Sequence, residues 1–219
     1  MRQLIKAVLP FLFALPLGVF ANSSMVFPFI GHIEFGYLIL FLVPFGITCA
    51  ANSMNMLEGF NGLGAGLGII ITSTLILLSL MNGKDEGLFL LVPLLGSLLA
   101  FFYFNKYPAK IFPGDTLTLF MGGIIGCAAI INNLKLEGVI LMFPMIVEFF
   151  LKLRGNFKGE CFAKMNEGGI LFHEGRIESL THLVMSNFTV DEIKLVRLFW
   201  FFELILCLFV IILTVMDII

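Results

Sequence analysis

The feature that most constrains this chain is a series of apolar segments, each of about twenty residues, the length that a helix needs to cross a bilayer. These segments recur from one end of the chain to the other, and 59% of the 219 residues are hydrophobic while only 13% are charged. Such a composition is too apolar for one water-soluble core. We therefore predict an all-α, polytopic membrane protein with about seven transmembrane helices. The expected spans are residues 7–20, 36–51, 63–81, 87–104, 116–131, 136–153 and 195–215.

The loops between these spans differ in basic charge, which predicts their orientation. Of the thirteen Lys and Arg residues, eleven fall on the side of the N-terminus and two, Lys84 and Lys135, on the other side. The positive-inside rule then places the N-terminus in the cytoplasm and the C-terminus outside. Residues 1–219 form a single membrane domain in this interpretation, and 154–194 form its longest cytoplasmic loop. A cleaved signal peptide over residues 1–22 is an alternative that the charge distribution disfavours.

A polar, glycine-rich loop follows the second span and reads CAANSMNMLEGFNGLGAGLG from Cys49 to Gly68. Asn52 and Asn55 are three residues apart, so a helix would place both amides on one face. Asn61 follows among glycines that would break the helix and let a ligand approach the backbone. A purely structural alternative is that the amides join neighbouring helices and the glycines allow close packing.

The next cytoplasmic loop reads FNKYPAKIFPGDTLTLFMGG from Phe104 to Gly123 and places Asp115 at the start of an apolar helix. An ionisable residue at the membrane edge usually has a function, although Asp is also a common helix N-cap. The amide of Asn55 and the carboxylate of Asp115 are hard oxygen ligands of the kind that Mg²⁺ uses beside phosphates. Lys106 and Lys110 could neutralise phosphate, but reaching towards lipid headgroups is the commoner role for such side chains.

Both loops resemble the signature segments of the polyprenyl-phosphate N-acetylhexosamine-1-phosphate transferases, which form glycosyltransferase family 4. The runs 52–63 and 105–116 are similar to those segments in order, spacing and predicted side. Asn61 stands where the bacterial branch usually has Asp, so the chain looks closer to the dolichyl-phosphate branch. The resemblance implies transfer of N-acetylglucosamine-1-phosphate from UDP-N-acetylglucosamine to dolichyl or polyprenyl phosphate, with release of UMP. That reaction is the first membrane step of lipid-linked oligosaccharide assembly for protein N-glycosylation.

The resemblance also implies roles for individual residues. Asn55 and Asp115 match the ligands of Mg²⁺, with Mn²⁺ as an alternative, and Lys6 matches a lysine that binds the acceptor phosphate. Lys6 and Asp115 would be the catalytic pair, and residues 47–56 would line the groove for the lipid phosphate. The expected substrate-binding residues are Lys6, Asn52, Gly59, Asn61, Phe112, Gly114 and Lys164, of which Asn61 and Phe112 would contact uracil.

Family members carry an adjacent pair of aspartates, and further spans, upstream of the lysine that matches Lys6. This chain would thus correspond to the C-terminal part of the family fold, and we expect an upstream start, a separate N-terminal fragment or an inactive product. The implied partners are UDP-N-acetylglucosamine, dolichyl or polyprenyl phosphate and membrane lipid, with no nucleic acid and with a homodimer as a further expectation. The location would be the cell membrane, or the endoplasmic reticulum in a eukaryote, with the active site facing the cytoplasm.

Other interpretations stay open at this point. The protein could use another UDP-sugar or prenol, or be an inactive scaffold or transporter-like protein, although breaks in the helices at the cytoplasmic edge suit a surface-facing site better than transport. Within the longest loop, Gly168 and Gly169 predict the turn of a hairpin in residues 160–172. The stretch from Thr189 to Glu192 fits a capping box at the start of the last helix.

Overall fold

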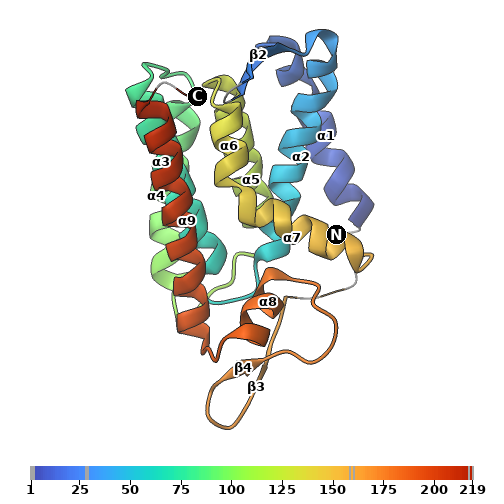
Figure 1. Ribbon diagram of the computed structural model, residues 1–219, viewed down its shortest axis with the longest axis vertical. Helices are drawn as coiled ribbons and strands as arrows, with labels where there is room; N and C mark the ends of the chain where they lie inside the picture. Colours follow the sequence, from blue (N-terminus) through green and yellow to red (C-terminus); the bar gives the residue numbers. More distant parts are fainter. Residues whose placement is uncertain (1–2, 28–29, 158, 160, 217, 219) are drawn as a thin grey trace.

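The computed structural model describes residues 3–27, 30–157, 159, 161–216 and 218, and shows a helical bundle with a short β-hairpin at each end (Figure 1). The helices α1 and α2 lie at one side of the bundle and α3, α4 and α9 at the other, with α5 and α6 between them. Their bounds are α1 Gln3–Phe20, α2 Ile39–Leu57, α3 Leu63–Met81, α4 Leu88–Asn105, α5 Gly114–Ile131, α6 Lys135–Leu141, α7 Phe143–Arg154, α8 Leu180–Asn187 and α9 Glu192–Val215.

Five helical segments among the described residues are long and apolar enough to cross a membrane, namely Gly36–Leu57, which joins a 3-10 turn to α2, and α3, α4, α5 and α9. They coincide with five of the predicted spans, so the prediction of a mostly helical membrane protein is confirmed in this coarser form. Helix α1 contributes a shorter apolar stretch, Val8–Phe20. The total of seven spans and the orientation of the two termini stay predictions.

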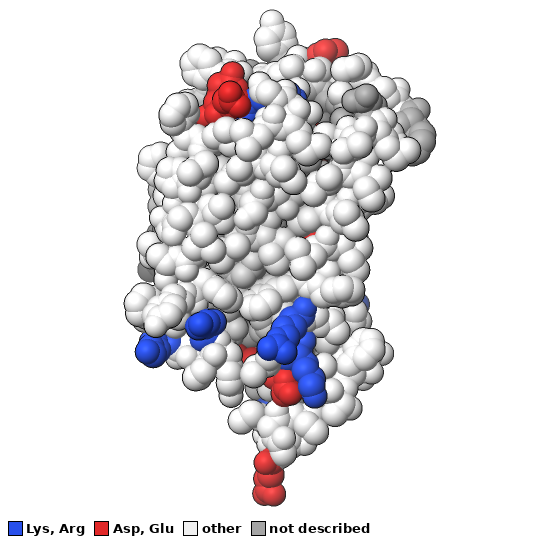
Figure 2. Space-filling view, turned by 90° about the vertical axis from the view of Figure 1, so that its left-hand side faces the viewer, with Lys and Arg blue, Asp and Glu red and all other residues white. Residues whose placement is uncertain are grey.

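Charged side chains are concentrated towards the two ends of the bundle. Figure 2 shows one face of the molecule, on which the middle is almost free of charge and Lys and Arg gather towards the end that carries α8. This end also holds loop 58–62, segment 106–113 and residues 155–190, and we call it the loop end. An uncharged belt between charged ends is the distribution that a bilayer requires of the surface in contact with lipid.

The predicted sixth span is interrupted, which the sequence analysis did not anticipate. Residues 136–153 form two helices, α6 and α7, that meet at Met142. Met142 has φ −93° and ψ 11°, outside the helical region, and Pro144 follows in the first turn of α7. Because proline has no backbone N–H and its ring clashes with the preceding turn, a helix changes direction or ends there. The expectation of one continuous helix at this place was therefore wrong.

The all-α prediction also missed a short hairpin at the end opposite the loop end. Strands β1 (Ser24–Phe27) and β2 (Gly31–Glu34) pair antiparallel, with Ser24 opposite Glu34. The Lys135 ammonium at the start of α6 donates to the Ser24 carbonyl over 2.9 Å and ties the hairpin to the bundle. Four-residue strands are too short for a period-two pattern to be recognised beside long apolar helices.

At the loop end, the predicted hairpin is confirmed and the predicted cap is not. Strands β3 (Lys164–Met165) and β4 (Leu171–Phe172) pair antiparallel around a turn in which Gly169 has φ +75°. The N-cap of α9, however, is Asp191, whose carboxylate accepts from the Lys194 amide at 2.7 Å. The expected capping box from Thr189 therefore begins two residues too early, because an ionised side chain nearer the helix took the capping role.

Helix α2 runs between α1 and α5 and packs closely on both. Gly122 of α5 lies against the Ala50 carbonyl so tightly that a side chain there would clash with the backbone of α2. Small residues at a membrane helix interface permit this approach. As a result, the polar residues at the ends of α1, α2 and α5 are brought together at the loop end.

Candidate active site at the loop end

An ion pair joins the first and fifth helices at the loop end. The Lys6 ammonium of α1 lies 2.7 Å from the Asp115 carboxylate of α5, and the lysine side chain is 11% exposed whereas the aspartate is 40% exposed. Asp115 is in the first turn of α5, whose N-cap is Pro113, so the alternative of an Asp115 N-cap is wrong. The carboxylate is instead directed towards a cation and keeps an exposed side.

Asn52 holds the lysine in place through the backbone. Its amide nitrogen donates to the Lys6 carbonyl at 3.0 Å and to the Thr48 carbonyl at 2.9 Å. The first bond ties α1 to α2 one turn from the predicted metal ligand Asn55, and the second lies within α2 and orients the amide. The structure thus gives Asn52 a bracing contact with α1, in line with the structural interpretation that the sequence left open.

Asn55 is placed beside the helix turn that carries Asp115. Its amide oxygen accepts from the Thr118 hydroxyl at 2.7 Å, and Thr118 itself lies three residues after Asp115 on α5. The same hydroxyl is 2.9 Å from the Gly114 carbonyl, and the threonine is 1% exposed. Sequence reasoning missed Thr118, although its spacing from Asp115 puts the two side chains on one helix face.

The donor set of Asn55 and Asp115 fits a hard divalent cation. One amide oxygen and one carboxylate come from facing helices, and no cluster of three or more His, Cys, Asp or Glu occurs among the residues that the structure describes. Mg²⁺ commonly binds through one or two protein oxygens and completes its shell with water and substrate phosphate. The ammonium now beside Asp115 shows that this carboxylate already faces a positive charge.

Loop 58–62 carries Asn61 between the end of α2 and the start of α3. The Leu63 amide donates to the Phe60 carbonyl at 3.1 Å and closes a turn. Gly62 has φ +79° in this turn, a backbone conformation that favours glycine. The Asn61 backbone amide donates to the Glu192 carboxylate of α9 at 2.7 Å. Asn61 itself is half-buried, so its side chain remains partly accessible.

Glu58 in the same loop was missed by the sequence analysis. Both of its carboxylate oxygens are buried, and the backbone amide of Gly64 at the start of α3 is the polar group beside them. The carboxylate occupies the space that a side chain at Gly64 would need. Burial raises the pKa of Glu58 to about 7. Its position between Asn55 and Asn61 was the only signal in the sequence.

Gly59 packs against the long loop of residues 155–190. A side chain at this position would meet the Cys161 sulfur, and the Cys161 thiol donates to the Glu58 carbonyl at 3.0 Å. The absence of a side chain at Gly59 therefore lets the long loop close on loop 58–62. The predicted substrate contact at Gly59 is not tested by this geometry.

Phe112 and Gly114 lie on segment 106–113 and at the start of α5. Phe112 is 60% exposed, so its ring is free to stack on a planar ligand. The Asn105 amide donates to the Ile111 carbonyl at 2.9 Å and holds the segment close to α4. Gly114 has φ +59°, a conformation that favours glycine and lets the chain turn into α5.

Lys164 is not brought into this cluster. It lies on β3 and pairs with Glu174 at 2.7 Å, and both side chains are about two-thirds exposed. The histidines of the long loop also serve packing, since the rings of His173 and His182 stack with centroids 3.5 Å apart. Burial lowers the pKa of His182 to about 4, so this imidazole is neutral at physiological pH.

A buried polar network anchors the long loop to α7. The Glu148 carboxylate accepts from the Leu180 amide at 2.7 Å and from the Ser179 hydroxyl at 3.1 Å. One turn later, the Lys152 ammonium donates to the Gly159 carbonyl at 2.7 Å and lies 3.5 Å from Glu148. A buried charge must be paired or hydrogen-bonded, and here the long loop provides the partners. The contacts therefore hold the loop against α7 at Gly159 and at Ser179 and Leu180.

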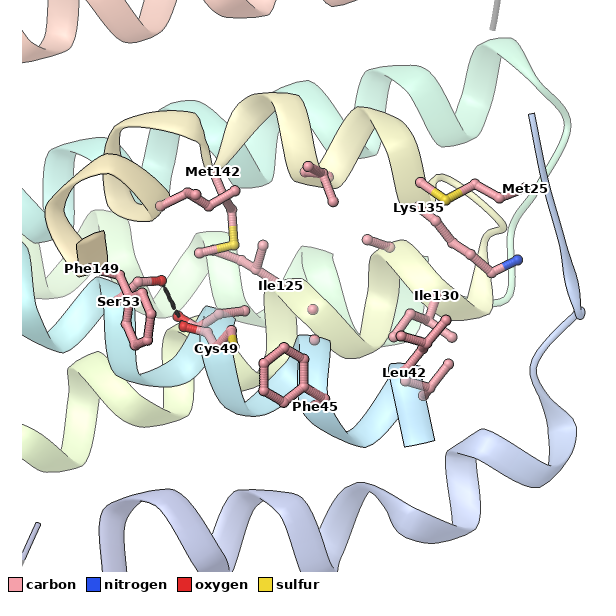
Figure 3. A pocket seen from close by; sticks show the side chains of 18 of the residues that line it. Met25, Leu42, Phe45, Cys49, Ser53, Ile125, Ile130, Lys135, Met142 and Phe149 are labelled. Atoms are coloured by element: carbon pink, nitrogen blue, oxygen red, sulfur yellow. Dashed lines mark hydrogen bonds between the residues drawn. The ribbon is translucent and has the colours of Figure 1, made fainter. Parts of the chain in front are cut away.

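An apolar groove runs along α2 beside the cluster. Its volume is about 440 Å³, and Figure 3 shows side chains from α2, α5 and α6 directed into it. Ser53 and Cys49 line it near the loop end, and Leu42, Ile130 and Lys135 line it further along. Ser53 lies two residues before Asn55 on α2, so one end of the groove reaches the turn of α2 that carries this predicted metal ligand.

The amino-acid sequence of this chain is similar to one protein family and to individual members of it. A model of glycosyl transferase family 4 matches residues 1–133. A protein of Saccharolobus solfataricus, provisionally named a UDP-N-acetylglucosamine–dolichyl-phosphate N-acetylglucosaminephosphotransferase, is 41% identical over 97% of this chain and 67% of its own length. A protein of Sulfolobus acidocaldarius with the same provisional name is 36% identical over 92% of this chain and 63% of its own length.

A bacterial relative matches a shorter part of the chain. The phospho-N-acetylmuramoyl-pentapeptide-transferase of Borreliella burgdorferi strain ZS7 is 37% identical over 58% of this chain and 41% of its own length. The chain spans about two-thirds of the length of the two archaeal relatives, at 67% and 63%.

Proposed function

Because the chain belongs to glycosyl transferase family 4, we propose that it transfers N-acetylglucosamine-1-phosphate from UDP-N-acetylglucosamine to dolichyl phosphate or another polyprenyl phosphate. The observation that carries this proposal is the convergence of Lys6, Asn55 and Asp115 from three helices at the loop end. The apolar groove beside them supports a lipid acceptor, since its length follows α2 into the bundle. The names of the two archaeal relatives support the same donor and acceptor.

In this reaction an oxygen of the acceptor phosphate attacks the phosphorus that carries the sugar, and UMP leaves in line with the attack. The bond that forms joins the two phosphates as a diphosphate, and the bond that breaks is the one to the phosphate of UMP. The acceptor phosphate is already ionised near neutral pH, so positioning and charge neutralisation matter more than a strong base. The Lys6 ammonium is suited to hold that phosphate, because it is a positive charge at the loop end next to the predicted metal ligand Asp115.

The family is metal-dependent, and we propose Mg²⁺ as the ion, with Mn²⁺ as an alternative. Asn55 and Asp115 would hold it, and when bound it would neutralise charge on the donor pyrophosphate. Thr118 would keep the Asn55 amide oriented, because its hydroxyl donates to the amide oxygen at 2.7 Å.

The uracil of the donor would lie between loop 58–62 and segment 106–113. Asn61 would provide hydrogen bonds to the base, and the exposed ring of Phe112 would stack on it. The positive φ of Gly114 would let segment 106–113 close over the nucleotide.

The loop end would face the cytoplasm, with seven spans in all. Lys and Arg residues gather near that end, as the positive-inside rule requires of cytoplasmic loops. The product would then be a diphosphate-linked sugar in the cytoplasmic leaflet, ready for the next sugar transfers of N-glycosylation.

A membrane assay tests this function. Membranes containing the protein expressed from its full gene would receive UDP-N-acetylglucosamine, dolichyl phosphate and Mg²⁺, and the release of UMP and the lipid-linked product would be measured. We expect both products, their loss with a chelator, and their absence in Asp115→Asn membranes. No Mg²⁺- or Mn²⁺-dependent UMP release with any UDP-sugar and polyprenyl phosphate would contradict the proposal.

A further inference from the structure

Loop 58–62 holds Asn61 in a turn that it cannot fix by itself. The turn is closed by the bond from the Leu63 amide to the Phe60 carbonyl, and the Gly66 amide bonds to the Gly62 carbonyl as α3 begins. Neither bond uses the Asn61 amide, which stands just before the first turn of α3. A backbone amide that is partly shielded from water needs a hydrogen-bond partner, and this turn offers the Asn61 amide none of its own.

Glu192 supplies that partner from the other end of the chain. Its carboxylate oxygen accepts from the Asn61 amide at 2.7 Å, although 131 residues separate the two positions. Glu192 is the first residue of α9, so the position of this last helix sets the position of the acceptor. A bond from an amide to an ionised acceptor is shorter and stronger than one between neutral groups.

Helix α9 is itself fixed against the start of α3. Two turns after Glu192, Trp200 packs so closely on Gly66 that a side chain at the glycine would overlap the indole. The Trp200 and Phe102 rings meet edge to face with centroids 5.6 Å apart. Gly62 lies against both rings, since a side chain there would be 3.2 Å from Phe102. The contact between Glu192 and Asn61 thus rests on a packed interface.

We propose that Glu192 is a positioning residue for the donor nucleotide. It fixes the backbone at Asn61 so that the Asn61 amide side chain faces the uracil, and it does so without touching the substrate. The inference rests on the proposed function in one respect, that Asn61 contacts the base. Removing the carboxylate would free the loop to sample other conformations and lower the fraction that can bind.

The test is uridine diphosphate binding to the purified full-length protein and its variants, measured by calorimetry. We expect Glu192→Ala to weaken binding about tenfold, the effect of losing one charge-assisted hydrogen bond that orders the site. Glu192→Gln keeps an oxygen acceptor and should stay within roughly threefold of the unmodified protein. In the transferase assay, KM for the UDP-sugar should rise in the alanine variant, while KM for the lipid phosphate and kcat change little.

Asp191→Ala provides the matched control. It removes the N-cap of α9, the bond to the Lys194 amide, and leaves the Glu192 carboxylate in place. It should lower the melting temperature without changing the affinity for uridine diphosphate. Hydrogen exchange of a peptide covering residues 58–62 should be faster in Glu192→Ala than in Asp191→Ala.

The possible results separate the inference from the function on which it rests. Equal affinity in Glu192→Ala and the unmodified protein, or an equal loss in Asp191→Ala, would overturn the positioning role. Retained nucleotide binding without transfer would count against the proposed reaction only. A complete lack of uridine diphosphate binding by the unmodified protein would overturn both.

Discussion

The Lys6 ammonium lies 2.7 Å from the Asp115 carboxylate, so the cation expected to bind the acceptor phosphate pairs with the carboxylate expected to bind the metal. A divalent ion at Asp115 would compete with the ammonium for the same oxygens. Lys6 would then be released from Asp115 and free to bind the acceptor phosphate. Metal binding and acceptor binding would therefore favour one another.

Asp115→Asn should separate activity from stability. The aspartate side chain is 40% exposed and the lysine only 11%, but the amide oxygen of the new asparagine can still accept from the ammonium, so the loss to folding should be about 1 kcal/mol. The melting temperature should therefore change little, while transfer should fall by about two orders of magnitude or more because a metal ligand is lost. Thermal unfolding in detergent and the UMP-release assay check the two parts. A large loss of stability with normal activity in the surviving protein would contradict this interpretation.

Lys6→Met should change the metal and acceptor requirements in opposite directions. Without the competing ammonium, the Mg²⁺ concentration for half-maximal activity should fall by a few-fold. KM for dolichyl phosphate should rise at least about tenfold, since a charged hydrogen bond to the phosphate is lost. Mg²⁺ and acceptor titrations of the same membranes measure both quantities. An increased Mg²⁺ requirement would show that the lysine does not compete with the metal.

Thr118→Val should weaken the metal site without touching a ligand. The substitution keeps the size of this buried side chain but removes the hydroxyl that donates to the Asn55 amide oxygen. A free amide can rotate, so the Mg²⁺ requirement should rise about tenfold, and Thr118→Ser should restore it. Thr214→Val is the matched control, because within the part of the chain that the structure describes this buried hydroxyl bonds to the Val210 carbonyl of its own helix and to no other residue. The same effect in the control would refute the role of Thr118.

The buried carboxylate of Glu58 should make the free energy of unfolding depend on pH. Its pKa is raised to about 7 in the folded protein, above the ordinary value of 4.5, so the neutral form is favoured by folding. The associated stability is fully present below pH 4.5 and is lost as pH rises through about 7, by about 3 kcal/mol in total. Glu58→Gln, which stays neutral, should unfold at a higher temperature than the unmodified protein at pH 8 and at a similar one at pH 4.5.

The control for this experiment is Glu167→Gln, which changes an exposed carboxylate on the hairpin turn. It should leave the difference between pH 4.5 and pH 8 unchanged. An identical pH profile of melting temperature for Glu58→Gln and the unmodified protein would show that ionisation of Glu58 does not destabilise the fold.

The sequence predicted the parts of the fold that depend on local hydrophobicity. Five spans follow from apolar length alone, and the hairpin at Gly169 follows from its turn residues. It did not predict the break at Met142, because Pro144 is tolerated in many membrane helices and the outcome depends on neighbouring helices. The N-cap of α9 was predicted two residues too early, because Thr189 and Asp191 are both common capping residues and lie within one turn.

The candidate site was predictable only in part, because its members are far apart in the chain. Asn55 and Asp115 were recognised from the loops that carry them, and the structure places them on facing helices. Thr118 and Glu192 act through contacts over 63 and 131 residues that no local pattern records. Lys164 was chosen because it falls nearest to the basic segment of the family, and it pairs with Glu174 on an exposed hairpin.

Filling the groove should impair use of the lipid acceptor but not nucleotide binding. Gly46 of α2 lines the groove, and a Cβ there would meet no atom within 4 Å, so Gly46→Leu should be accepted by the backbone and place its side chain in the groove. KM for dolichyl phosphate should rise about tenfold, because the apolar chain loses buried surface, while uridine diphosphate binds as before. Gly96→Leu on α4 is the control, since that exposed helical glycine is equally open but lies outside the groove. If both variants raise KM equally, the groove between α2 and α5 does not hold the acceptor chain.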